Sequence, residues 1–116
     1  MSYNSVFKSE LFANTVMIIT GGGSGIGRCC AHELSHLGAH VVLIGRKEDK
    51  LKKVQAEIIE DGGQADYWIC DIREEDVVKA TVQAIKEKHG VIHGLLNNAG
   101  GQYPSPLVAI NQKGFE

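Results

Sequence analysis

The chain has 116 residues, of which 43% are hydrophobic and 22% are charged, and its formal net charge is −2. This length holds one domain at most, and this composition is typical of an ordinary soluble globular segment. Because charges of both signs are interspersed, no basic field favours nucleic acid or an anionic membrane as a partner.

Residues 1–14 form a polar N-terminal arm without the apolar core of a secretion signal, and no apolar run approaches the length of a membrane span. The chain contains three cysteines, an odd number, and the first two, Cys29 and Cys30, are neighbours. Together with Cys70 they favour a reducing cytoplasm, in which thiols serve as small buried apolar groups.

The first predicted strand covers residues 16–19, four consecutive apolar residues that are typical of a strand buried on both faces. A glycine-rich run follows, and a helical pattern then begins. Glycine allows a sharp turn and the close approach of a ligand. The unpaired N–H groups and positive dipole end of the helix attract a phosphate or pyrophosphate. The stretch therefore predicts a phosphate-binding loop.

Three phosphate-loop patterns compete for this stretch. The Walker pattern nearly fits residues 22–29, but Arg28 stands where lysine belongs and Cys29 replaces the Mg²⁺-binding Ser or Thr. The pattern G-x-G-x-x-G, tried from Gly21, fails because Ile26 occupies its last position. The chain does match T-G-x-x-x-G-x-G, whose fixed positions are Thr20, Gly21, Gly25 and Gly27. A tight glycine turn without a ligand remains the alternative.

Apolar spacing predicts the next two helices and the strand between them. The first helix carries one apolar face and ends near Gly38, and a second buried strand covers residues 41–44. A second helix ends at residues 61–63 (DGG). The residues expected to face the core are Ile26, Cys30, Leu34 and Leu37 in the first helix and Leu51, Val54 and Ile58 in the second.

A third strand over residues 65–70 is more polar, which places it at an edge of the sheet. A third helix covers about residues 74–88, and a fourth strand covers residues 92–97, with Leu95 and Leu96 as its most certain buried pair. The inward residues of this helix are expected to be Val78, Val82 and Ile85.

Alternating strands and helices predict an α/β fold of the Rossmann type, a doubly wound parallel sheet with right-handed crossovers. The strand order 3-2-1-4 puts the polar third strand outside and sets the first and fourth strands side by side at the topological switch point. The glycine loop and Asn97–Asn98 then face each other across a crevice. A helical start near Val108 and an apolar fourth edge predict that residues 15–116 are the first half of a longer domain.

Basic residues follow the second predicted strand, at the position that distinguishes NAD from NADP. About 20 residues beyond the glycine loop, an acidic side chain would hold the ribose hydroxyls of NAD. This chain has Gly45-Arg46-Lys47 there, and two cations suit the 2′-phosphate of NADP. NADP is therefore favoured over NAD, although a solvated turn before a helix fits the same residues.

Four motifs in order, namely the glycine loop, the basic pair, Asp71-Ile72 and Asn97-Asn98-Ala99-Gly100, resemble the short-chain dehydrogenase/reductase family from Thr15 to Glu116. The resemblance implies an NADP-dependent oxidoreductase that transfers a hydride between the nicotinamide and a small carbonyl, alcohol or enoyl substrate. It implies that Asp71 accepts a hydrogen bond from the adenine amino group while Ile72 packs on the ring. The alternative for Asp71 is a cap of the next helix.

The resemblance also assigns the remaining cofactor contacts. The loop is expected to hold the pyrophosphate, and the N-N-A-G element is expected to line the ribose–nicotinamide side. The expected residues are Gly21, Gly23, Ser24, Gly25, Ile26 and Gly27 in the loop, and Asn98, Ala99 and Gly100 in the element. Residues 98–106 look like those of members that act on enoyl-CoA thioesters or on terpenoid alcohols such as citronellol, with Gly101 and Gln102 bordering the substrate pocket. Dimers and tetramers are usual for the family.

No catalytic residue is assigned within the chain. The family's chemistry needs a Tyr-x-x-x-Lys pair with a Ser upstream, and none of Tyr3, Tyr67 and Tyr103 has a lysine four residues later. Asn111 lies too close to Gly100 to be the family's helix asparagine. A non-catalytic NADP-binding module, a sensor or a scaffold, is therefore the rival function. The basic pair disfavours an FAD or nucleotide-sugar site.

One motif is interpreted as a coincidence. Residues 32–36 (HELSH) match the zinc-protease pattern H-E-x-x-H. The predicted buried face of that helix lies opposite His32 and His36, so both are expected in solvent, and no metal site is expected.

Overall fold

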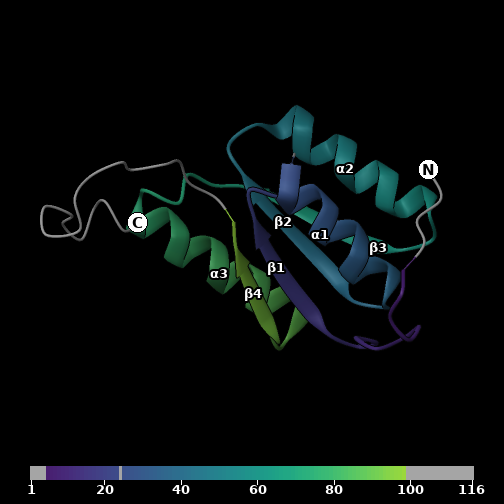
Figure 1. Ribbon diagram of the computed structural model, residues 1–116. Coiled ribbons are helices and arrows are strands. Elements are labelled where there is room, and N and C mark those ends of the chain that lie inside the picture. Colours follow the sequence, from purple (N-terminus) through teal and green to yellow (C-terminus); the bar gives the residue numbers. More distant parts are fainter. Residues whose placement is uncertain (1–4, 24, 99–116) are drawn as a thin grey trace, which may run out of the picture.

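A computed structural model describes residues 5–23 and 25–98 (Figure 1). One parallel sheet has the strand order β3-β2-β1-β4, which confirms the predicted fold class and order. Its strands are β1 (Val16–Thr20), β2 (His40–Gly45), β3 (Gln64–Ile69) and β4 (Gly94–Asn97). The helices between them are α1 (Gly25–His36), α2 (Glu48–Glu60) and α3 (Glu75–His89).

The sheet is the middle layer, with α1 and α2 on one face and α3 on the other (Figure 1). Alternate residues of a strand point to opposite faces, so β2 contributes to both cores. Val41 and Leu43 pack on the side of α1 and α2, whereas Val42 and Ile44 pack on the side of α3. All four are at least 96% buried, as expected for a central strand.

The register places the ends of the central strands at one edge. Thr20 at the end of β1 pairs with Ile44 of β2 on one side and with Asn97 of β4 on the other. The segments that follow these three strands therefore emerge beside one another. This is the switch point at which the strand order reverses, and it is where open α/β sheets bind ligands.

The helix boundaries follow the expected turn chemistry. Gly38 lies just after α1 with φ +99°, a left-handed conformation that other residues adopt at a steric cost. Leu51, Val54 and Ile58 of α2 are each 1% exposed, which confirms the predicted face of that helix.

The predicted face of α1 is wrong at its first position. Ile26 is 73% exposed, and the buried residues of α1 are Gly27, Ala31 and His32. Gly27 and Ala31 are small and let the helix lie close to the sheet. The prediction is confirmed for Leu34, which packs against the core, and for Leu37, which is 1% exposed. Ile26 sits at the first turn of the helix, next to the glycine loop.

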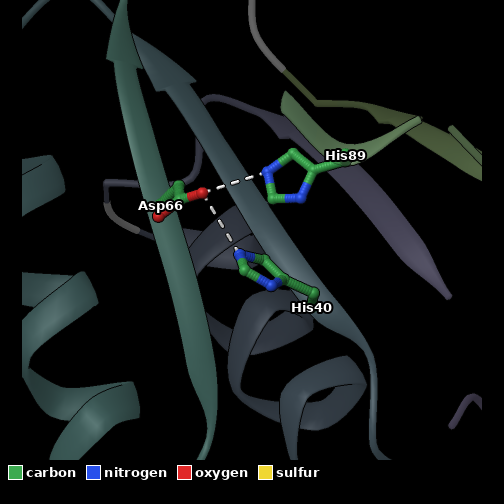
Figure 2. Close-up of side chains that lie close together, drawn as sticks. All are labelled: His40, Asp66 and His89. Atoms are coloured by element: carbon green, nitrogen blue, oxygen red, sulfur yellow. Dashed lines mark hydrogen bonds and ion pairs between the residues drawn. The ribbon is translucent and has the colours of Figure 1, made fainter. Parts of the chain in front are cut away.

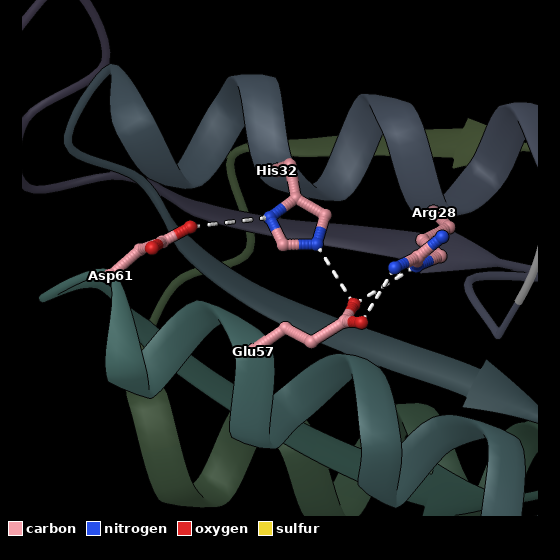
Figure 3. Close-up of polar contacts among 4 residues, drawn as sticks. All are labelled: Arg28, His32, Glu57 and Asp61. Atoms are coloured by element: carbon pink, nitrogen blue, oxygen red, sulfur yellow. Dashed lines mark hydrogen bonds and ion pairs between the residues drawn. The ribbon is translucent and has the colours of Figure 1, made fainter. Parts of the chain in front are cut away.

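The environment of His32 contradicts the prediction that it lies in solvent. Its side chain is 4% exposed and its Nε2 lies 3.1 Å from Glu57 Oε1 of α2 (Figure 3). Arg28 donates to the same carboxylate through Nε at 2.9 Å and Nη2 at 2.5 Å. The Nδ1 of His32 lies 3.9 Å from Asp61, just beyond the end of α2. His32 thus belongs to a polar contact between α1 and α2, whereas His36 is exposed as expected.

Predictions of burial are wrong at two further apolar residues and at one cysteine. Leu95 is 64% exposed, because the described elements cover only the face of β4 that carries Leu96. Val82 is 39% exposed, whereas Ile85 is buried and Val78 packs against the core, as predicted; Thr81 is the other buried residue of α3. The expectation of buried thiols holds for Cys70 but not for Cys29, which is exposed.

Among the described residues, no helix combines the length and the apolar character needed to cross a membrane.

Candidate functional site

The loop between β1 and α1 has a backbone shape that requires glycine. Gly21 and Gly25 adopt φ values of +66° and +59°, in the left-handed region. The N–H of Gly21 donates to Ile44 O at 2.8 Å, which ties the loop to the end of β2. The loop therefore turns sharply, and α1 begins directly after it. The N–H groups of the first helical turn, which have no partner within the helix, lie next to the loop. Ser24 lies outside the described residues.

Gly27 lets the first turn of α1 touch the loop. A Cβ atom at this position would lie 2.2 Å from Gly21 O and 2.7 Å from Asn98 Nδ2. No side chain fits in that space. The positive end of the α1 dipole is consequently held directly behind the loop, in the arrangement that attracts phosphate.

Thr20 and Asn98 join the loop to β4. The backbone N–H of Asn98 donates to Thr20 Oγ1 at 2.9 Å, and the Asn98 side-chain amide donates to Gly21 O at 3.4 Å. Thr20 Oγ1 lies 3.2 Å from Asn97 Oδ1. Asn98 thus supports the loop from across the crevice, as the sequence predicts for residues that face each other there. Ala99 and Gly100 lie outside the described residues, as do Gly101 and Gln102.

A basic cavity of about 180 Å³ adjoins the loop. Its lining consists of Gly21, Gly23, Gly45, Arg46, Lys47, Lys50 and Leu51, so the described lining contains three cations and no carboxylate. The structure brings the predicted pair of Arg46 and Lys47 to the glycine loop and adds Lys50, which the sequence analysis missed. The signal was present, because Lys50 follows Lys47 by three residues and so lies on the same side of the helix.

Asp71 follows β3, near enough to Arg46 of the cavity lining to be affected by its charge. It accepts hydrogen bonds from the backbone N–H of Arg73 at 3.0 Å and from its Nε and Nη2 at 3.1 and 2.9 Å. These bonds, with a smaller contribution from the Arg46 charge, lower the pKa of Asp71 to about 2. Asp71 does not cap α3, because the N-cap of that helix is Glu74. Ile72 packs against the core on the α3 side of the sheet.

The geometry defines one anion-binding surface with two parts. The loop backbone and the start of α1 form one part, and the three cations form the other. Gly21 and Gly23 belong to both, so the surface is continuous. A ligand that carries a diphosphate and a further phosphate fits this pattern, because backbone N–H groups and cationic side chains both bind phosphate oxygens. The space that Gly27 keeps free and the absence of a carboxylate from the described lining are the features that favour this fit.

Comparisons with known proteins agree with this description. The family model of short chain dehydrogenases matches residues 15–116. The chain is similar to the citronellol catabolism dehydrogenase AtuB of Pseudomonas aeruginosa PAO1, with 58% identity and a TM-score of 0.84, over 97% of this chain and 46% of that one. It is also similar to a metagenomic short-chain oxidoreductase in complex with NADP, with 37% identity and a TM-score of 0.77, over 90% of this chain and 48% of that one.

A curated relative is the 3beta-hydroxysteroid dehydrogenase of Mediterraneibacter gnavus, 40% identical over 89 residues, which are 77% of this chain and 32% of that protein. The chain therefore spans about a third of this relative and just under half of each of the two solved structures. The parallel sheet in the order 3-2-1-4, the glycine loop at its switch point and the family match over residues 15–116 lead to one conclusion: the chain belongs to the short-chain dehydrogenase family.

Proposed function

We propose that the protein that contains this chain is an NADP-dependent oxidoreductase, and that residues 15–116 supply the NADP-binding half of its domain. The observation that carries the proposal is the continuous surface formed by the glycine loop and three cations, with no carboxylate in its described lining. A carboxylate there would repel the 2′-phosphate and favour NAD. The substrate is proposed to be a small carbonyl, alcohol or enoyl compound.

Each part of the surface has its own role in this proposal. The backbone N–H groups that follow Gly21 in the loop, those of Gly23, Ser24, Gly25, Ile26 and Gly27, hold the diphosphate. Gly21, whose own N–H is bound to Ile44 O, shapes the turn. Arg46 and Lys47 bind the 2′-phosphate, with Lys50 beside them. When bound, the nicotinamide ring supplies the hydride chemistry, while the protein provides binding and orientation.

The carboxylate of Asp71 serves the adenine end of the site. Its low pKa keeps it ionised, so it accepts from the adenine amino group while it remains paired with Arg73. Asn98, Ala99 and Gly100 line the ribose–nicotinamide side, and Asn98 fixes the loop that faces them. Ile72, whose partly buried side chain packs against the core on the α3 side, packs on the adenine ring in this proposal.

The substrate class is proposed from similarity. The 58% identity to a citronellol catabolism dehydrogenase favours a terpenoid alcohol or aldehyde over an enoyl-CoA thioester. The assay is the change in NADPH absorbance with citronellol and NADP⁺ and, in reverse, with citronellal and NADPH. The protein is further proposed to act in the cytoplasm as a homo-oligomer, a dimer or tetramer, without nucleic-acid or membrane partners.

The cofactor assignment is tested by exchanging the cations. In the double variant Arg46→Asp, Lys47→Ser, we expect the dissociation constant of NADPH to rise about 100-fold or more, since two charge-assisted bonds of at least about 1.5 kcal/mol each are lost. NADH, which has no 2′-phosphate, should bind with a change of less than about threefold. Titration calorimetry measures both.

The matched control is Lys52→Ser, Lys53→Asp, which changes the net charge equally at exposed positions of α2 outside the cavity lining. It should leave both affinities unchanged. Equal losses for NADPH and NADH in the first variant would contradict the role of Arg46 and Lys47. Tight NADPH binding without turnover of any carbonyl, alcohol or enoyl substrate would favour the rival, a non-catalytic NADP-binding module.

A further inference from the structure

His40, Asp66 and His89 converge at the other end of the sheet. His40 opens β2, Asp66 lies in β3 and His89 ends α3. Figure 2 shows both imidazoles directed at the carboxylate of Asp66, with His40 Nε2 3.3 Å and His89 Nε2 3.0 Å from Oδ2. The two rings meet edge to face, with centroids 4.5 Å apart. Three residues that are distant in the sequence thus present one ligand atom each to a common point.

We propose that these three side chains bind a divalent transition-metal ion of the zinc class. The donor set of two imidazoles and one carboxylate is of the kind that zinc takes in three-ligand sites, where water fills the fourth position. Metal–ligand bonds of about 2.0–2.2 Å in a tetrahedron place ligand atoms about 3.4 Å apart. The nitrogen–oxygen distances of 3.0 and 3.3 Å are close to this spacing, and all the ligand atoms lie within 4.8 Å of one another.

The burial of the cluster suits a bound ion. The side chains of His89, Asp66 and His40 are 9%, 20% and 25% exposed, so packing restricts them while solvent still reaches the point at which they converge. A carboxylate and two imidazoles on different elements are ready to coordinate without a change of backbone.

Lys88 is the competitor at this site. Its Nζ lies 2.9 Å from Asp66 Oδ2, the same oxygen that both imidazoles approach. A metal ion takes the place of this ammonium, because two cations do not share one carboxylate oxygen without repulsion. The Lys88 side chain is 55% exposed, so an ion pair of this kind contributes little and is displaced easily.

The proposed metal site does not depend on the cofactor site. His40 is the first residue of β2 and Gly45, which lines the basic cavity, is the last, so the two sites are separated by about 16 Å along the strand. An ion here joins β2, β3 and α3 and should stabilise their packing. The site escapes sequence analysis because its residues are 26 and 23 positions apart and no short motif contains them.

The test is a Co²⁺ titration of the purified protein without a polyhistidine tag, followed by visible absorption and by competition with Zn²⁺. The protein carries Cys29→Ser, because this exposed thiol can bind Co²⁺ itself. We expect one ion per chain, the absorption of four-coordinate Co²⁺, and a higher midpoint of thermal unfolding with Zn²⁺. His40→Ala and His89→Ala should each weaken binding more than about 100-fold, since loss of an outer-shell partner alone costs about 10- to 100-fold.

His36→Ala, at an exposed histidine of α1, is the matched control and should bind as the parent does. Circular dichroism shows whether the alanine variants fold. If they do not, Asp66→Asn, which keeps the shape of the side chain, tests the proposal instead and should lose metal binding. Lys88→Met should tighten binding, and unchanged affinity there would contradict the competition. No binding up to about 1 mM Co²⁺ or Zn²⁺, or binding that survives His89→Ala and Asp66→Asn, would overturn the proposal.

Discussion

The variant Gly27→Ala tests whether contact between α1 and the loop creates the phosphate site. An added Cβ would lie 2.2 Å from Gly21 O, more than 1 Å short of the 3.4 Å at which ordinary contacts begin. Gly21 cannot easily move away to relieve this clash. The N–H of Gly21 is bound to Ile44 O at 2.8 Å, and its carbonyl accepts from Asn98.

The magnitude follows from this geometry. Overpacking a close contact costs about 1–3 kcal/mol. Because both partners are backbone atoms, we expect Gly27→Ala to lower the free energy of unfolding by about 3 kcal/mol. The shift of the helix start away from the loop also misdirects its N–H groups. Losing two charge-assisted bonds of at least about 1.5 kcal/mol each corresponds to a rise of about 100-fold or more in the dissociation constant of NADPH.

Urea denaturation, monitored by the fluorescence of the single tryptophan, and NADPH titration are the assays. The control is Gly62→Ala, because Gly62, unlike Gly27, has a positive φ, +90°, and a Cβ there has no neighbour within 4 Å, so this variant carries backbone strain without a clash. This control should lose about 1–2 kcal/mol from backbone strain and keep its cofactor affinity. A Gly27→Ala protein no less stable than the control, with NADPH affinity within about threefold of the parent, would refute the reasoning.

Three further predictions concern single side chains. Arg28 and His32 lower the pKa of Glu57 from its ordinary 4.5 to about 2, so its stabilising effect is complete above pH 4.5 and is lost as pH falls toward 2. Allowing for solvent screening at Arg28, we expect Glu57→Gln to lose about 1–2 kcal/mol at pH 7 and to show a flatter stability profile across that window, by urea denaturation. Thr20→Val leaves the N–H of Asn98 without its acceptor, which should cost about 1–3 kcal/mol of unfolding free energy and weaken NADPH binding in titration calorimetry. Trp68→Phe removes a buried Nε1 that has no partner among the described residues, so thermal unfolding should show a change within about 1 kcal/mol.

Each of these predictions has a control. Glu60→Gln, exposed on the same helix, should leave the pH profile unchanged, and a Glu57→Gln profile identical to the parent would contradict the pairing. Thr81→Val removes a hydroxyl that bonds only within α3 among the described contacts, so it should not affect NADPH. Normal NADPH affinity in Thr20→Val would show that the Thr20 side chain is not needed to support the loop. A loss above about 2 kcal/mol in Trp68→Phe would contradict this prediction and would mean that the indole stabilises the fold through its packing against the core or through its N–H.

The sheet was predictable because its strands are apolar runs separated by helical patterns. Ile18, Ile19 and the apolar residues of β2 are buried, as a parallel sheet requires, and the polar β3 lies at an edge. The phase of α2 was also predictable, since its apolar residues follow a single helical spacing.

The phase of α1 and the role of His32 were not predictable in the same way. Two of the three buried residues of α1, Gly27 and Ala31, are small, and hydrophobicity does not identify them as contacts. The contact between His32 and Glu57 spans 25 positions and depends on how two helices meet. Lys50 shows a different limit, because helical spacing would have added it to the basic pair.

The bond between Thr20 and Asn98 joins residues 78 positions apart, and it has a consequence for the order of assembly. During synthesis the glycine segment leaves the ribosome long before the strand that braces it. Contacts of such long range form late, after the intervening chain has condensed. The proposed cofactor site is therefore expected to form last, so that a nascent chain shorter than about 100 residues contains the glycine loop but not Asn98, which supports it.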